Sequence, residues 1–140
     1  MKKETYLDVT QEAGREFFMK QTGGNVVMLN LLKFKEYADY SQYPDLAPAS
    51  KISGEEAYQL YIKHTLPFLR AAGSEVLYQG KSENFLIGPK DEKWDLVLLV
   101  KHESKAKFME FATNKEYLAG SGHRTAALED SRLLPAEEGF

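Results

Sequence analysis

The pattern of hydrophobic positions predicts two strands that are buried on both faces. Residues 25–34 and residues 94–102 are each almost continuous in apolar side chains and are bounded by polar or glycine residues. Such runs are typical of strands that are covered on both sides. Residues 75–80 and 84–88 predict two further strands or one bent strand, and residues 131–135 predict a closing strand.

Helical spacing predicts the element between the first two strands. Ser53 and Glu56 form a capping-box sequence, which starts a helix. Apolar side chains then recur every three to four residues until Gly73, a residue type that commonly ends helices. Pro67 is expected to kink this helix or to loosen the turn before it.

Two segments lie outside this alternation of strands and helices. A helix is predicted over residues 10–22, before a pair of glycines. Residues 37–50 contain three tyrosines and two prolines without helical or strand periodicity, which predicts an irregular insertion. Farther along, Ser104 is expected to cap a helix, and residues 123–129 predict a short one.

The order of elements predicts the fold class. After the N-terminal helix, a strand–helix–strand unit occurs twice, which is the α+β, ferredoxin-like βαββαβ pattern. It implies an antiparallel sheet with helices on one face. Residues 1–140 are expected to form a single domain with its core at 26–135. Because the central strands are apolar on both sides, the second face of the sheet also needs cover, and a second subunit is the simplest cover.

Several segments of the chain together resemble the DUF1330 family of the dimeric α/β-barrel superfamily. They are residues 27–34, 61–67, 78–80, 94–95 and 124–135. The resemblance implies a homodimer joined through the sheet faces, with a cavity between each sheet and its helices or loops. The N-terminal helix and the insertion depart from the family pattern and are candidates to cap that cavity. Activity in the family is largely undefined, and the superfamily includes cofactor-independent monooxygenases, haem-handling proteins and muconolactone-type isomerases.

Composition narrows the chemistry that such a protein can perform. The 140 residues carry 18 lysines and arginines against 21 acidic residues, a formal charge of −3 that offers no field for nucleic acid. The absence of cysteine excludes thiol nucleophiles, disulfides and cysteine-based metal sites, and it suits a cytoplasmic location. No apolar run approaches the roughly 20 residues that a membrane-spanning helix needs. Imidazole, amide, phenol and carboxylate groups are left for catalysis.

The chain has three histidines, and no two of them have the spacing of a helical metal pair. No metal or cofactor is therefore expected. His64 lies on the inner face of its predicted helix and is the first candidate for a general base, because imidazole has a suitable pKa. His123 is the second candidate. His102 ends a predicted strand beside charged residues and is expected to be solvated.

Five further residues are candidates for ligand binding. A buried Asn30 needs a hydrogen-bond partner, either protein backbone or ligand, because an unsatisfied amide costs about 1–3 kcal/mol. Tyr78 and Trp94 have rings that suit stacking on a planar ligand, although aromatic residues in strands are usually core. Arg124 is expected either in an ion-pair set or turned inward to hold a carboxylate. The candidate set is Asn30, Tyr61, Tyr78, Trp94 and Arg124.

Three functional hypotheses remain open from the sequence. The first is a small-molecule-binding dimer, as a cofactor-independent oxygenase or isomerase acting on a small apolar or aromatic compound. The second is a non-catalytic dimeric module whose insertion seals the barrel or contacts a partner; it predicts that Asn30 bonds to backbone and that His64 packs without a cavity. The third and weaker hypothesis is haem binding through His64 or His123.

Overall fold

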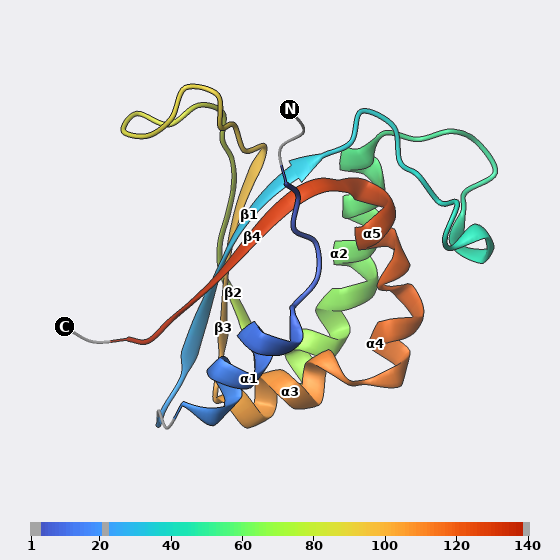
Figure 1. Ribbon diagram of the computed structural model, residues 1–140. Coiled ribbons are helices and arrows are strands. Elements are labelled where there is room, and N and C mark those ends of the chain that lie inside the picture. Colours follow the sequence, from blue (N-terminus) through green and yellow to red (C-terminus); the bar gives the residue numbers. More distant parts are fainter. Residues whose placement is uncertain (1–3, 21–22, 139–140) are drawn as a thin grey trace.

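The computed structural model describes residues 4–20 and 23–138 (Figure 1). The elements in chain order are α1 (Gln11–Met19), β1 (Val26–Phe34), the short 3-10 helix η1 (Pro44–Leu46), α2 (Gly54–Ala71), β2 (Glu75–Lys81), β3 (Leu96–His102), α3 (Lys105–Ala112), α4 (Lys115–Gly120), α5 (Gly122–Ala127) and β4 (Leu128–Ala136).

The four strands form one antiparallel sheet in the order β2-β3-β1-β4. Helices α2 to α5 lie on one side of this sheet (Figure 1). The connections β1-α2-β2 and β3-α3-α4-α5-β4 are two split strand–helix–strand units. The predicted α+β, ferredoxin-like βαββαβ fold is therefore confirmed, and α1 precedes it.

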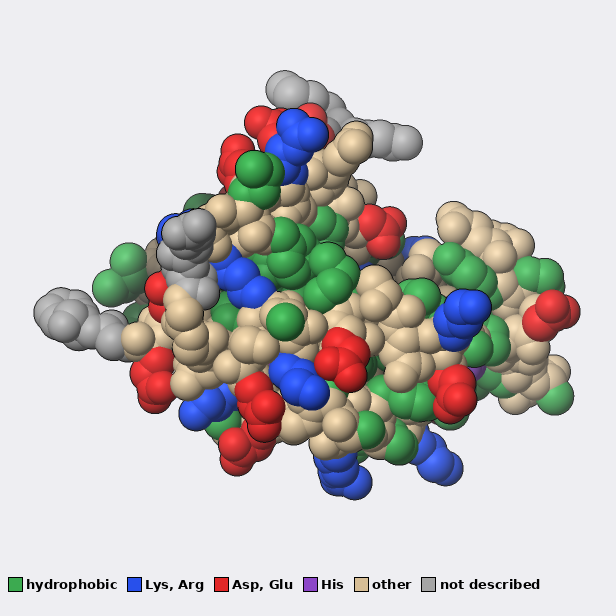
Figure 2. Space-filling view, turned by 90° about the horizontal axis from the view of Figure 1, so that it is seen from below, with side chains coloured by type: hydrophobic (Ala, Val, Ile, Leu, Met, Phe, Trp, Pro, Cys, Tyr) green, Lys and Arg blue, Asp and Glu red, His purple; other side chains and the backbone are tan. Residues whose placement is uncertain are grey.

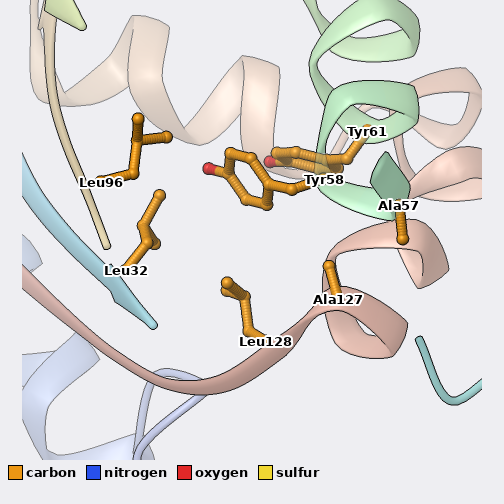
Figure 3. Close-up of a cluster of buried hydrophobic side chains, with 7 residues drawn as sticks. All are labelled: Leu32, Ala57, Tyr58, Tyr61, Leu96, Ala127 and Leu128. Carbon is orange, nitrogen blue, oxygen red and sulfur yellow. The ribbon is translucent and has the colours of Figure 1, made fainter. Parts of the chain in front are cut away.

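The contact of α2 with the sheet forms the centre of the core. Ser53 Oγ accepts a hydrogen bond from the Glu56 amide at 3.0 Å, and the Glu56 carboxylate accepts one from the Ser53 amide at 3.0 Å, which completes the capping box. Helix α2 then directs two tyrosines, Tyr58 and Tyr61, toward the sheet (Figure 3). Around them lie the other buried members of this cluster, Leu32, Ala57, Leu96, Ala127 and Leu128.

Pro67 does not interrupt α2, which continues to Ala71. Proline removes one amide donor and leaves the carbonyl of residue 63 without its helical partner. Both Pro67 and Lys63 are exposed, so this carbonyl lies on the side of the helix that water reaches. Gly73 follows the helix with a φ of 77°, as expected for a helix end.

Three predicted boundaries differ from the structure. Residues 84–88 are not a strand, because this loop pairs only through an isolated bridge between Asn84 and Lys93. The predicted helix over 123–129 ends at Ala127, where β4 begins. The predicted helix over 10–22 is α1 with Thr10 as its N-cap, and residues 21–22 lie outside the described range.

The face of the sheet away from the helices is apolar, and none of the described helices lies over it (Figure 1). Residues paired directly across antiparallel strands point to the same face, so Leu29 shares this outer face with Leu99 and Leu134. These side chains are half-buried or exposed, whereas Leu98 and Val100, which face the helices, are buried. The apolar members of the outer face are Val27, Leu29, Leu31, Tyr78, Val97, Leu99 and Leu134.

The described residues contain no candidate for a membrane-spanning helix. None of their helices combines the length and the apolar character that crossing a bilayer requires.

Replacing Ser53 with alanine is expected to lower the free energy of unfolding by about 1 kcal/mol, because the first turn of α2 loses its cap. Ser50→Ala serves as the control, since Ser50 is exposed and precedes the helix. Urea denaturation followed by circular dichroism measures both variants. Equal stability of the two variants would contradict a stabilising capping box.

Candidate functional site

A groove of about 570 Å³ lies between α2 and the β2–β3 edge of the sheet. Its walls are the apolar side chains of Ile62, Leu66 and Leu96, with Tyr58 between them. The volume falls within the roughly 300–1,000 Å³ typical of small-molecule sites. Apolar walls with a few polar groups are the composition expected of such sites, which makes this groove the candidate functional site.

Tyr58 supplies a polar group inside the groove. Its side chain is only 3% exposed, and Figure 3 shows its hydroxyl directed toward Leu96. Burial, together with the neighbouring Tyr61, raises the pKa of the Tyr58 hydroxyl far above its ordinary value. Tyrosine is already protonated at physiological pH, and burial favours this form further, so the hydroxyl can donate a hydrogen bond to a bound molecule.

Charged side chains form the rim of the groove. Lys81 of β2 pairs with Glu55 of α2, with 3.2 Å between Nζ and Oε1, and Lys63 also lines the groove. The Lys81 side chain is 80% exposed, so this ion pair contributes little stability and opens easily. Two lysines against one glutamate give the rim a net positive charge.

None of these groove residues is among the predicted site residues, but the sequence does carry a signal for them. Glu55, Gln59, Ile62 and Leu66 recur at intervals of three to four residues, so they form a second stripe on α2. This stripe lies beside the core-facing one. The mixture of polar and apolar residues hides it from a search for apolar periodicity alone.

His64 connects α2 to α4. Its Nε2 atom donates to the backbone carbonyls of Glu116 and Tyr117, at 2.9 and 3.1 Å. Since carbonyl oxygens only accept, Nε2 carries the ring proton in this arrangement. The ring packs on the backbone of Gly120, where a methyl group would not fit. His64 does not line the groove.

His123 connects α5 to the insertion over residues 37–50. Its Nδ1 atom shares a hydrogen bond with the Tyr40 hydroxyl, at 2.7 Å. Burial and the nearby His64 lower the pKa of His123. Tyr43 of the insertion lies against Gly122, and a side chain at position 122 would collide with its ring. The insertion thus packs closely on α5.

Asn30 and Tyr61 both have protein partners on the helix side of the sheet. Asn30 Nδ2 donates to the carbonyls of Met28 and Leu98, each at 3.3 Å. The hydroxyls of Tyr61 and Tyr117 lie 2.7 Å apart and share a hydrogen bond. The Nδ2 atom of Asn30 thus has backbone partners.

Arg124 is turned inward, but it binds protein groups. It donates to the carbonyl of Leu7 at 2.7 Å and to the Ser131 hydroxyl at 3.3 Å. Ser131 in turn donates to the carbonyl of Tyr6. Arg124 and Ser131 therefore hold the segment before α1 against β4.

Helix α1 packs at the lower end of the molecule. Phe17 lies edge-on to Phe108 of α3, with 6.1 Å between ring centroids, and Lys105 donates to two carbonyls at the end of α1. Seen from below, hydrophobic side chains gather in a central recess bordered by charged side chains (Figure 2). Neither α1 nor the insertion contributes a residue to the groove.

The two remaining predicted aromatic residues are separated from each other. Tyr78 is on the outer face of the sheet and 56% exposed. Trp94 is 3% exposed and donates from Nε1 to Glu92 at 2.9 Å. Asn30, Tyr61, Tyr78, Trp94 and Arg124 are thus not brought together around one site.

His102 is not solvated, contrary to the expectation from its charged neighbours in sequence. Strand β3 turns its side chain toward the helices, where it is 2% exposed and contacts Phe108 and Phe111. Its Nδ1 atom shares a hydrogen bond with the Ser74 hydroxyl at 2.8 Å. Burial lowers the pKa of His102 to about 4.

Two solved structures identify the family of this chain. The RPA0582 protein of Rhodopseudomonas palustris, described as a protein of unknown function, is 34% identical over 98% of this chain and 99% of that chain, with a TM-score of 0.86. Its methylated form is 33% identical over 97% of this chain and 96% of that chain, also with a TM-score of 0.86. The chain belongs to the RPA0582 family.

More distant similarity shows the fold alone. A DABB-family protein of Mesorhizobium loti, described as having a ferredoxin-like fold, is 13% identical over 84% of this chain and 100% of that chain, with a TM-score of 0.52. No protein-family model matches the chain, and no curated protein does. Within the described residues no group of three or more histidine, aspartate or glutamate side chains is placed to hold a metal ion.

The buried His102 predicts a loss of stability in acid. Its pKa is about 4 in the folded protein against 6.5 for an ordinary histidine, so the unfolded chain binds more protons between these pH values. The free energy of unfolding therefore falls as the pH drops from 6.5 to about 4, by up to about 3 kcal/mol from this residue. Denaturation of the protein and of His102→Gln at several pH values measures the effect. An equally steep pH dependence in both would contradict it.

Proposed function

We propose that this chain is a small-molecule-binding protein and that the α2–β2 groove is its binding site. The observation that carries the proposal is the buried, neutral hydroxyl of Tyr58 inside an apolar groove of about 570 Å³. A hydrogen-bond donor with apolar walls favours a compact apolar or aromatic compound that carries an acceptor. We also place the chain, within the RPA0582 family, in the wider DUF1330 group that its sequence resembles.

The contacts of the histidines favour a binding function over oxygenase or isomerase activity. The His64 Nε2 atom donates to two carbonyls, and the His123 Nδ1 atom bonds to Tyr40. A general base must reach the proton that it removes, and neither histidine lines the groove. Cofactor-independent catalysis in this groove would instead use the groups at its rim, such as Lys63.

We further propose that the protein is a homodimer whose chains pack through the outer faces of their sheets. The support is the apolar surface centred on Leu29, Leu31 and Leu99, which no element within residues 4–20 and 23–138 covers. Burying apolar surface contributes about 25 cal/mol for each Å², so leaving a whole sheet face in water is unfavourable. A two-fold pair of these faces covers both at once.

Ligand binding is tested by a thermal-shift screen of small aromatic and aliphatic acids and phenols. Each hit is then titrated against the protein, Tyr58→Phe and Tyr37→Phe. Loss of one hydrogen bond weakens binding up to about tenfold, so Kd should rise for Tyr58→Phe. It should stay unchanged for Tyr37→Phe, the matched control, because Tyr37 is 52% exposed and does not line the groove. The absence of any hit, or equal effects of the two variants, would refute the groove as the site.

Dimer formation is tested by size-exclusion chromatography with light scattering. The protein should elute at twice the mass of one chain at micromolar concentration. Leu99→Lys, which puts a charge at the centre of the outer face, should be a folded monomer. Leu118→Lys is the control, since Leu118 is 48% exposed on α4 and lies on the helix side. A wild-type monomer would exclude this interface.

A further inference from the structure

The loop between β2 and β3 holds apolar side chains out in water. We name residues 82–95 the finger. At its tip Leu86 and Ile87 are 101% and 92% exposed, and Phe85 is 39% exposed. Figure 1 shows the finger standing away from the body of the molecule. Two adjacent aliphatic side chains with this exposure mark an interaction surface, unlike the scattered apolar residues common on protein surfaces.

Hydrogen bonds join the two ends of the finger at its base. The Ser82 amide donates to the Asp95 carbonyl at 3.1 Å, and the Trp94 amide donates to the Glu83 carbonyl at 3.3 Å. The Ser82 hydroxyl donates to the Trp94 carbonyl at 2.7 Å. Since the Trp94 side chain is buried, it anchors this base to the body of the protein.

The tip also has a set conformation. Gly88 has a φ of 155°, and the ring of Phe85 lies against it so closely that a side chain at position 88 would collide. Phe85 thus folds back on the finger. Leu86 and Ile87 are left almost fully exposed at the turn.

The direction of the finger relates it to the outer face of the sheet. In Figure 1 the finger bends to the side of the sheet away from the helices, the same side toward which the end of β4 runs. Tyr78 and Val97, on the strands that continue into the finger, belong to the apolar outer face. The tip and the outer face are therefore presented on the same side, so one occupant can cover both.

We propose that this occupant is a second copy of the chain, and that the finger of each chain packs its tip on the other. The inference rests on the proposed homodimer and adds an arm to it. In a two-fold dimer both fingers make the same contact, so each tip residue acts twice.

The charges of the finger favour a protein partner over a lipid surface. Residues 82–95 carry two lysines, Lys90 and Lys93, against four acidic residues. Segments that bind anionic membranes carry an excess of lysine and arginine. An apolar tip on an acidic support fits a protein surface instead.

A single-cysteine label reports what covers the tip. The chain has no cysteine, so Ile87→Cys and the control Leu118→Cys each take one environment-sensitive fluorophore. On dilution through the dimer Kd, the emission of the label at position 87 should shift to the red, at the same concentration at which light scattering shows dissociation. The label at position 118, on the helix side, should not shift.

The double variant Leu86→Ser/Ile87→Ser measures the contribution of the tip. Its dimer Kd should rise at least about tenfold, as expected when buried apolar contacts are lost twice in one complex. Leu118→Ser should leave Kd unchanged. The melting temperature under monomeric conditions shows whether the variant is folded.

The outcomes separate this inference from the homodimer itself. If the protein dimerises but the label and the double variant show no change, the finger does not contact the second copy and the dimer stands. If the protein is a monomer at every concentration, both proposals fail. If the label at position 87 shifts to the blue with phosphatidylcholine vesicles and does not respond to dimer formation, the tip binds lipid and the inference is overturned.

Discussion

The structure depends on two central strands that are apolar on both faces. One face of β1 and β3 is covered by helices, with Leu32, Leu96 and Leu98 buried beneath α2 and its neighbours. The other face repeats the same chemistry with Leu29, Leu31 and Leu99, but in the described part of the chain no layer covers it. A sheet of this composition is stable in water when both faces are covered. The fold of one chain therefore supplies half of the required cover, and a second chain is proposed to supply the rest.

Helix α2 couples this core to the groove. One stripe of the helix packs Tyr61 against the sheet, and the adjacent stripe lines the groove with Ile62 and Leu66. Tyr58 belongs to both the core and the groove, because it is a member of the buried cluster and also lines the groove. His64 fixes α2 to α4 through two carbonyls. The groove is thus framed by elements whose positions are set by the core, which favours a preformed site.

The elements with strong local signals are those that the sequence predicts well. The capping box at Ser53, the glycine at position 73 and the two apolar runs each depend on neighbours in sequence, so their physical cause is visible there. Residues 84–88 resemble a strand in composition, yet they form the exposed tip of the finger, because their strand pairing with the described residues is limited to the single bridge between Asn84 and Lys93.

Side-chain direction and long-range contact account for the rest. His102 has charged neighbours, but the strand alternation and the position of α3 bury it. Asn30 and Arg124 were predicted to have partners, and the identity of those partners depends on Leu98 and on the segment before α1, which are distant in sequence. The groove forms only when β2 and α2 lie side by side, and no local sequence pattern encodes that arrangement. The division of the chain into a single domain with its core at 26–135 stays a prediction.

The central claim, that a second copy covers the outer sheet face, is tested most directly by isotope-filtered NOE spectroscopy on a mixture of methyl-labelled and unlabelled chains. It predicts intermolecular cross-peaks from the methyl groups of Leu29, Leu31 and Leu99. Intermolecular cross-peaks confined to residues of α2 to α5, or none at all, would contradict it.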